Sequence, residues 1–358
     1  MKKRTDGNEF YKKLLTIAPS TYDASRYDFQ QHLKKCFDKY LRWLDEYGLD
    51  NIKASNAKTI DLITEAVQLY YEGRHSKAFE CIKDHLYHLW DHRNFPFKDY
   101  YRMRIFDDGE KHDRNGMFHI PFNKRTIVKT QRFSAPGYPC LYLGTSAYIC
   151  WEEMLRPNLD RCYVSRFHID KPITLFDLTL PLQKIVKNTD LSRYDLSIFP
   201  LIIASMVKVA NPKDPFKPEY IIPQLLMEWI IDQRSEWSNN RIMGIAYTSV
   251  QKSYDFNFSP LKSINVAIPA FSPFEGNYSE ELCEMFQLTN PTCDELERAK
   301  CPYQAIERDE KISDLEYKYQ ISTFGQLEAR LSDVKRFPLR NIKNTSKKDV
   351  DLKKKISE

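Results

Sequence analysis

The sequence lacks any apolar segment that approaches the ~20 residues needed to cross a bilayer. Its first ten residues, MKKRTDGNEF, are not followed by the apolar region of a secretory signal. We therefore expect a protein that stays in the cytoplasm and makes no membrane contact.

Glycine-rich phosphate cradles and serine-hydrolase signatures are also missing. Neither G-x-G-x-x-G nor G-x-x-x-x-G-K occurs, so a bound phosphate would have to be held mainly by side chains. The absence of a G-x-S-x-G elbow argues against a hydrolase with a serine nucleophile. The sequence also has no large excess of charge of one sign, because 54 basic and 49 acidic residues leave a net charge of only +5. Nucleic acid binding is not indicated by so small a value.

Metal-binding signatures are weak. The eight cysteines form no C-x-x-C pair, which favours reduced thiols over disulfides or a zinc site. His85, His88 and His92 have helical spacing and could share a metal. The adjacent apolar residues favour histidines at the boundary of a core instead, so we expect no metal.

The periodicity of the sequence changes near residue 95. Before it, apolar residues recur at spacings of three and four, for example Leu33, Phe37, Tyr40 and Leu44, which predicts an all-α N-terminal domain over residues 1–95. Residues 98–330 mix strands and helices and are predicted to form the catalytic domain, and residues 331–358 a basic tail. The predicted strands are at 101–106, 126–131, 139–143, 162–169, 173–178, 241–250, 264–271 and 316–324, with helices at 198–210 and 220–233.

These elements follow no regular βαβ repeat. An α+β domain with a mixed or largely antiparallel sheet therefore fits the sequence better than a doubly wound fold.

One stretch, residues 132–154, has the composition of a polar ligand site: RFSAPGYPCLYLGTSAYICWEEM. A Pro-Gly turn precedes the strand at 139–143, and Thr145 or Ser146 can cap the helix that follows. Glu152 and Glu153 are adjacent on that helix, so they point about a hundred degrees apart. Glu153 shares a stripe with Ile149 and is expected to face the sheet, although glutamates most often lie in solvent.

The other candidate residues are arginines, a tyrosine and a serine. Arg102, Arg104 and Arg132 could converge on a pyrophosphate, since the guanidinium fork suits phosphate, although arginines on a solvated sheet face are common. Tyr142 could stack on a heterocycle or simply belong to the core. Ser249 follows an apolar strand and could hydrogen-bond a ligand or only start a turn.

The order YYRMR, QRFSAPGYPCLYLGTSAYICWEEM and IMGIAYTSV resembles the RES-domain family, named for an Arg, a Glu and a Ser in such settings. The resemblance covers about residues 98–270 and places the family's residues at Arg102, Arg132, Tyr142, Glu153 and Ser249. The interval between Glu153 and Ser249 is longer here than in smaller family members.

The resemblance implies a fold similar to ADP-ribosyltransferases and an enzyme that degrades NAD by phosphorolysis or hydrolysis, as a bacterial toxin or defence protein. NAD would be the substrate, inorganic phosphate a possible co-substrate and a cognate antitoxin a possible partner. Glu153, Arg102 and Ser249 would be catalytic, and Arg132, Tyr142 and Arg104 would bind NAD. The alternatives are transfer of ADP-ribose to a protein or nucleic acid, and a non-catalytic module that binds a partner.

Overall fold

The computed structural model describes residues 13–25, 28–90, 94–107, 109–186, 191–235, 242–250, 259–271, 277–300, 303, 306–309 and 311–338. His92, Cys301 and the basic tail beyond residue 338 lie outside these residues. The chain forms two compact units. Unit 1 contains residues 1–93, 130–135 and 174–250, and unit 2 contains residues 94–129, 136–173 and 251–358. A unit boundary thus falls next to residue 95, but unit 1 also includes two later segments of the chain. The domain limits derived from the sequence remain predictions.

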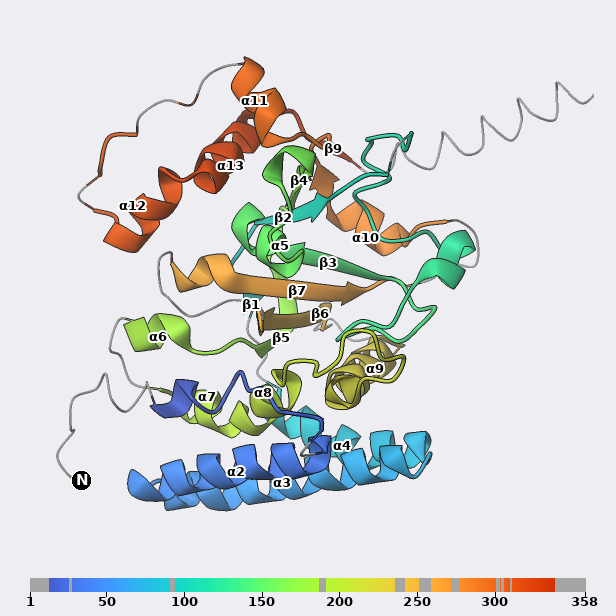
Figure 1. Ribbon diagram of the computed structural model, residues 1–358, viewed down its shortest axis with the longest axis vertical. Helices are drawn as coiled ribbons and strands as arrows, with labels where there is room; N and C mark the ends of the chain where they lie inside the picture. The colour runs from blue at the N-terminus through green and yellow to red at the C-terminus, as the bar shows by residue number, and fades with distance from the viewer. Residues whose placement is uncertain are drawn as a thin grey trace, which may run out of the picture. The chain divides into compact units, whose positions relative to one another are not determined.

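Unit 1 is mainly helical, as predicted for the N-terminal region (Figure 1). Asp28 accepts a hydrogen bond from the Gln31 amide and caps α2, whose apolar stripe is buried. Pro223 is in the first turn of α9, where its missing N–H group costs no helical hydrogen bond. The helices are α2 (Phe29–Glu46), α3 (Asp50–Tyr71), α4 (His75–Leu89), α6 (Leu182–Val186), α7 (Arg193–Ser197), α8 (Phe199–Ser205), η3 (Pro218–Tyr220) and α9 (Ile221–Ser235). The strands β5 (Ile173–Leu178) and β6 (Gly244–Thr248) pair in parallel.

Unit 2 is built on antiparallel strands in the order β7-β3-β2-β4-β8-β9. These strands are β7 (Ile264–Pro269), β3 (Cys140–Gly144), β2 (Asp99–Arg104), β4 (Tyr163–His168), β8 (Gln287–Leu288) and β9 (Phe337–Pro338). The remaining elements are β1 (Asn94–Phe95), η1 (Phe122–Ile127), α5 (Ala147–Glu153), η2 (Leu159–Arg161), η4 (Pro260–Ser263), α10 (Glu280–Met285), α11 (Asp294–Lys300), α12 (Asp314–Gln320) and α13 (Thr323–Asp333). Helices with parallel and antiparallel strand pairs confirm the α+β class.

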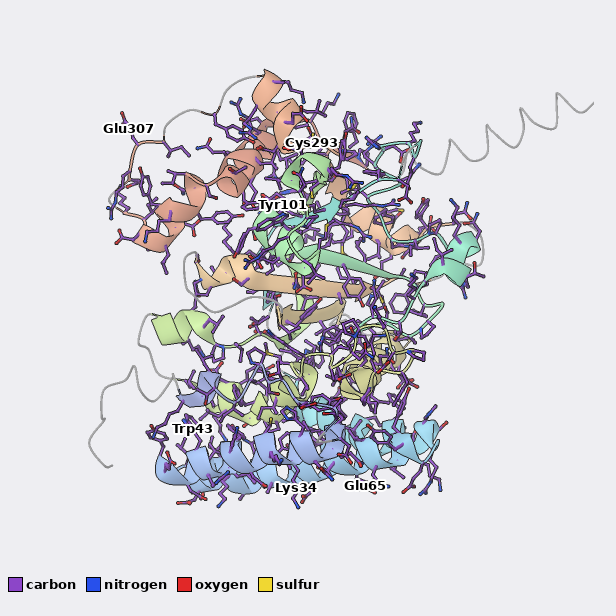
Figure 2. The ribbon with its side chains drawn as sticks, viewed as in Figure 1. Lys34, Trp43, Glu65, Tyr101, Cys293 and Glu307 are labelled. Atoms are coloured by element: carbon purple, nitrogen blue, oxygen red, sulfur yellow. The ribbon has the colours of Figure 1, made fainter. Side chains whose placement is uncertain are left out.

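The centre of the unit 2 sheet is the strand β2. It pairs with β4 along its whole length, from Asp99 opposite His168 to Arg104 opposite Tyr163. With β3 it has one registered pair, between Tyr101 and Gly144. Figure 2 labels Tyr101 in this sheet. The strand that carries the predicted arginines is therefore fixed mainly from its β4 side.

Two predicted strands are wrong. Residues 126 and 127 are the last two residues of η1, and residues 128–131 form no named strand. Residues 316–324 belong to α12 and α13, because Ser313 and Ser322 cap these helices by accepting hydrogen bonds from the Glu316 and Gly325 amides. The alternation of tyrosines with polar residues at 316–324 predicted a strand, but the two capped helices form there instead.

The findings on membrane-spanning helices and metal-binding groups concern only the part of the chain that the structure describes. There, no helix is both long and apolar enough to cross a membrane. No group of three His, Cys, Asp or Glu residues among them could hold a metal ion. His85 instead lies 2.7 Å from the Thr59 hydroxyl oxygen, through its Nε2 atom.

Candidate functional site

The predicted site residues divide between the two units. Arg102, Arg104, Tyr142 and Glu153 belong to unit 2. Arg132 and Ser249 belong to unit 1, in the segments 130–135 and 174–250. Each group is described within its own unit.

The helix α5 carries the candidate carboxylate and begins at the cap that the sequence predicts. Of the two hydroxyl candidates, Ser146 is the cap, because its Oγ accepts a hydrogen bond of 3.0 Å from the Ile149 amide. Thr145 has a different role: its amide donates to the Ile264 carbonyl and its hydroxyl to the Leu261 carbonyl. The start of α5 is thereby tied to η4 and to the first residue of β7.

Gly144, at the end of β3, lets α5 pack closely on the sheet. A Cβ atom at this position would lie 2.4 Å from Cγ2 of Ile149 and 2.8 Å from Sγ of Cys150. Both distances are shorter than van der Waals contact, so any side chain here would push the helix outward. In the register of β3 and β7, Gly144 is opposite Asn265.

Glu153 reaches the sheet through Asn265. The Asn265 side-chain amide donates a hydrogen bond of 2.6 Å to Oε1 of Glu153. Asn265 is buried, and Glu153 is partly exposed. A carboxylate held by a buried amide has a defined orientation, so the end of α5 presents this group at the sheet, as the sequence predicts.

Glu152 points elsewhere. Its carboxylate is buried and accepts a hydrogen bond of 2.9 Å from Nε of Arg156. Leu155 and Arg156 have φ angles of 63° and 56°, a left-handed conformation that costs non-glycine residues about 1–2 kcal/mol each. The Glu152 contact helps to hold this sharp turn directly after α5. The two adjacent glutamates therefore have distinct surroundings.

Arg102 on β2 has an unusual environment for a charged group. Its Nη1 atom is buried and has no hydrogen-bond partner among the residues that the structure describes. Burial, together with the nearby charge of Arg104, lowers the pKa of Arg102 to about 10. A guanidinium with a buried, unused donor is costly unless an anion joins it, which makes Arg102 a candidate for anion binding.

Arg104, two residues further along β2, already has partners. Its guanidinium donates to the Gly116 carbonyl at 2.9 Å and to the Glu110 carboxylate at 2.7–2.9 Å. It also lies over the ring of Phe106, 4.9 Å from the ring centre. The structure therefore distinguishes two arginines that the sequence could not separate.

Three other side chains interact electrostatically with Arg102, and each interaction changes a pKa. Tyr142, half-buried on β3, and Cys150 on α5 both act electrostatically on its pKa. Burial raises the pKa of the Cys150 thiol to about 12. His119 is buried, and burial together with the charge of Arg102 lowers its pKa to about 4. Its Nε2 accepts from the Ser279 amide, so Nδ1 carries the proton toward the Ile120 carbonyl.

In unit 1, Arg132 donates to the Ser205 carbonyl at 2.7 Å and lies over the Tyr220 ring at 5.2 Å. The next residue, Phe133, is fully buried with its ring centre 4.6 Å from that of Tyr247 on β6. Ser249 is fully buried just after β6. Phe133 thus fixes the segment of Arg132 against the strand that leads to Ser249.

Sequence reasoning did not identify Asn265 or His119. Asn265 is the single amide in the apolar segment INVAIP, and that polar residue in a buried strand was an available signal. His119, in MFHIPF, has no spacing that distinguishes it, because its partners Ser279 and Arg102 are distant in sequence.

Comparison with known proteins identifies a family and one relative. Residues 101–268 match the family model described as the RES domain, a range that includes every predicted site residue and Asn265. A protein of Bacillus subtilis (strain 168) named "Putative toxin YopC" is 31% identical over 300 residues, covering 74% of this chain and 65% of the relative. The chain thus spans less than two thirds of that relative. No solved structure gives a significant match.

Proposed function

Because residues 101–268 of this chain form a RES domain, we propose that the protein is an enzyme that consumes NAD by breaking the bond between nicotinamide and ribose. The observation that supports this most is the orientation of the Glu153 carboxylate by the Asn265 amide, at 2.6 Å. NAD is proposed as the substrate because of the family resemblance described from the sequence. The structure adds a carboxylate, that of Glu153, whose direction is fixed by a hydrogen bond.

The proposed chemistry needs one well-placed negative charge. Breaking the nicotinamide–ribose bond develops oxocarbenium character on the ribose, as glycoside cleavage does. A carboxylate beside that carbon and its hydroxyls stabilises the positive charge, and pre-orientation avoids reorganisation during the reaction. Nicotinamide leaves as a neutral molecule, so no strong general acid is required. Glu153 is the residue to which we assign this role.

Arg102 would bind a phosphate group of NAD or an incoming phosphate ion. Its unpartnered, buried Nη1 would then gain a charge-assisted hydrogen bond, which removes the cost of burying it. Arg104 would contribute its charge at longer range, since its donors already contact Glu110 and Gly116. Tyr142 would position the nicotinamide or ribose.

The biological setting that we propose is that of a bacterial toxin. This rests on the RES domain and on the name of the Bacillus relative. A toxin of this class would be accompanied by a cognate antitoxin protein, and its work on NAD would take place in the cytoplasm.

A product analysis tests the proposal. Purified protein is incubated with NAD, with and without inorganic phosphate, and the products are separated by chromatography. Release of nicotinamide with ADP-ribose indicates hydrolysis, and a phosphate-dependent ADP-ribose phosphate indicates phosphorolysis. Labelled ADP-ribose attached to macromolecules of a cell extract would indicate a transferase instead. NAD that stays intact under all three conditions would contradict the proposal.

A further inference from the structure

The helix α5 is too short to set its own position. It has seven residues, fewer than two turns, and isolated helices of this length are unstable in water. The direction of Glu153, the last residue of α5, therefore depends on the groups that contact the helix. One of these groups comes from α13, which lies beyond the RES match at residues 101–268.

Glu328 on α13 binds the first residue of α5. Its Oε1 accepts a hydrogen bond of 2.7 Å from the backbone amide of Ala147. The same oxygen accepts 2.6 Å from the Tyr319 hydroxyl, and Oε2 lies 3.3 Å from Nζ of Lys262. A carboxylate at this point satisfies an amide that the helix itself leaves unpaired, and it opposes the positive end of the helix dipole.

Glu328 is itself held firmly. It is almost fully buried, and burial raises the pKa of its carboxyl while Lys262 acts in the opposite direction. Lys262 also lies over the Tyr319 ring, 4.5 Å from its centre, and its carbonyl accepts from the hydroxyl of Ser146, the α5 cap. The network therefore joins α12, α13, η4 and the start of α5.

Apolar side chains of α13 reinforce the contact. Leu327 and Leu331 share a buried cluster with Ala147 of α5 and with Tyr101 of β2. The Phe324 ring lies 5.3 Å from that of Trp151 and 5.4 Å from that of Tyr148, both on α5. In Figure 1, α12 and α13 follow one another at the upper left of the view, near α11.

We propose that Glu328 is a positioning residue for Glu153, and that α12 and α13 complete the catalytic unit although they lie outside the RES match. This inference rests on the proposed function for its effect on catalysis. Ala147 and Glu153 are separated by about 9 Å along the helix axis at 1.5 Å per residue. A tilt of α5 caused by loss of the Ala147 contact is carried along the helix to the Glu153 carboxylate and away from Asn265.

The test compares Glu328→Gln and Glu328→Ala with Asp333→Asn, which removes a charge from an exposed position on the same helix. NAD turnover is measured at temperatures where each variant is fully folded, so that a lower fraction of folded protein does not mimic a lower rate. We expect kcat to fall about 10- to 100-fold in Glu328→Ala, and less in Glu328→Gln, with a smaller change in KM. Asp333→Asn should match the wild type.

Hydrogen–deuterium exchange of the peptide that contains residues 147–153 provides a readout that is independent of NAD. Faster exchange in Glu328→Ala, with wild-type exchange in Asp333→Asn, supports the positioning contact even if the wild-type protein leaves NAD intact, a result that would contradict the proposed function alone. Unchanged exchange in Glu328→Ala would overturn the inference. If the wild type consumes NAD, an unchanged kcat in Glu328→Ala would overturn it as well.

Discussion

The side chain of Asn265 on β7 holds Glu153 on α5 through a hydrogen bond of 2.6 Å between Nδ2 and Oε1. The two residues are 112 positions apart in the chain. Asn265 is also opposite Gly144 in the sheet, at the point where α5 packs most closely. The carboxylate is therefore oriented by the sheet as well as by its own helix.

Replacement of Asn265 should lower catalysis more than binding. In Asn265→Ala the Glu153 carboxylate loses its orienting donor, so we expect kcat to fall about 10- to 100-fold with a smaller change in KM. Asn265→Asp places a second carboxylate beside Glu153, which raises the pKa of the pair. Its pH–rate profile should therefore move to higher pH. Identical pH–rate profiles for Asn265→Asp and the wild type would argue against a contact between residue 265 and Glu153 that affects catalysis.

Arg102→Met should make the ligand-free protein more stable while it weakens NAD binding. The substitution removes a buried donor that has no partner among the described residues, which should raise the free energy of unfolding by about 1–3 kcal/mol. The lost charge-assisted bond should raise KM at least about 10-fold. Urea unfolding and steady-state kinetics measure the two effects.

Arg104→Met is the matched control for Arg102→Met, since it is two residues along the same strand. It removes the ion pair with Glu110 and should lower stability slightly, by up to about 1 kcal/mol, with a smaller rise in KM than in Arg102→Met. If the two variants have equal KM values, Arg102 has no special part in binding.

Gly144→Ala should weaken the packing of α5 on β3. The new methyl group would overlap Ile149 and Cys150, so the free energy of unfolding should fall by about 1–3 kcal/mol. Because α5 also carries Glu153, the folded variant should have a lower kcat. Calorimetric melting measures the stability, and NAD turnover measures kcat. Wild-type stability and wild-type kcat in Gly144→Ala would show that α5 can shift without loss of stability or activity.

His119 should make the protein sensitive to acid. Its pKa is about 4 in the folded protein and near 6.5 when unfolded, so the unfolded state binds the proton first as the pH falls. The neutral histidine contributes full stability above about pH 6.5, and up to about 3 kcal/mol is lost toward pH 4. His119→Gln does not titrate.

Urea unfolding between pH 7.5 and 4.5 measures this effect as the difference between the wild type and His119→Gln. His32 and His85, whose pKa values are also lowered by burial, occur in both proteins and cancel. The wild type should lose more stability than the variant over this range. Parallel curves would assign the acid sensitivity to other groups.

Local patterns predicted much of the structure around α5. The strand at 139–143, a hydroxyl cap at Thr145 or Ser146 and the orientation of Glu153 toward the sheet all follow from residues within one short segment. Such features depend on turn chemistry, on capping and on helical spacing, which the sequence shows directly.

The features that the sequence did not reveal depend on distant partners. Glu328 binds the amide of Ala147 across 181 positions, and Asn265 faces Glu153 only because β7 pairs with β3 in one register. The tyrosine alternation at 316–324 predicted a strand, yet Tyr319 is buried as part of a capped helix that supports Glu328. Register and tertiary packing decide these positions, and neither is encoded in a local period.

The central claim is that Glu153, and not its neighbour Glu152, acts on the ribose of NAD. The most direct measurement is NAD turnover by the wild type, Glu153→Gln and Glu152→Gln, each checked for folding by circular dichroism. We expect Glu153→Gln to lose about 100-fold or more in kcat while it stays folded. Glu152→Gln should keep turnover close to the wild type, because its side chain contacts Arg156 in the turn after α5. Wild-type turnover in Glu153→Gln would contradict the account.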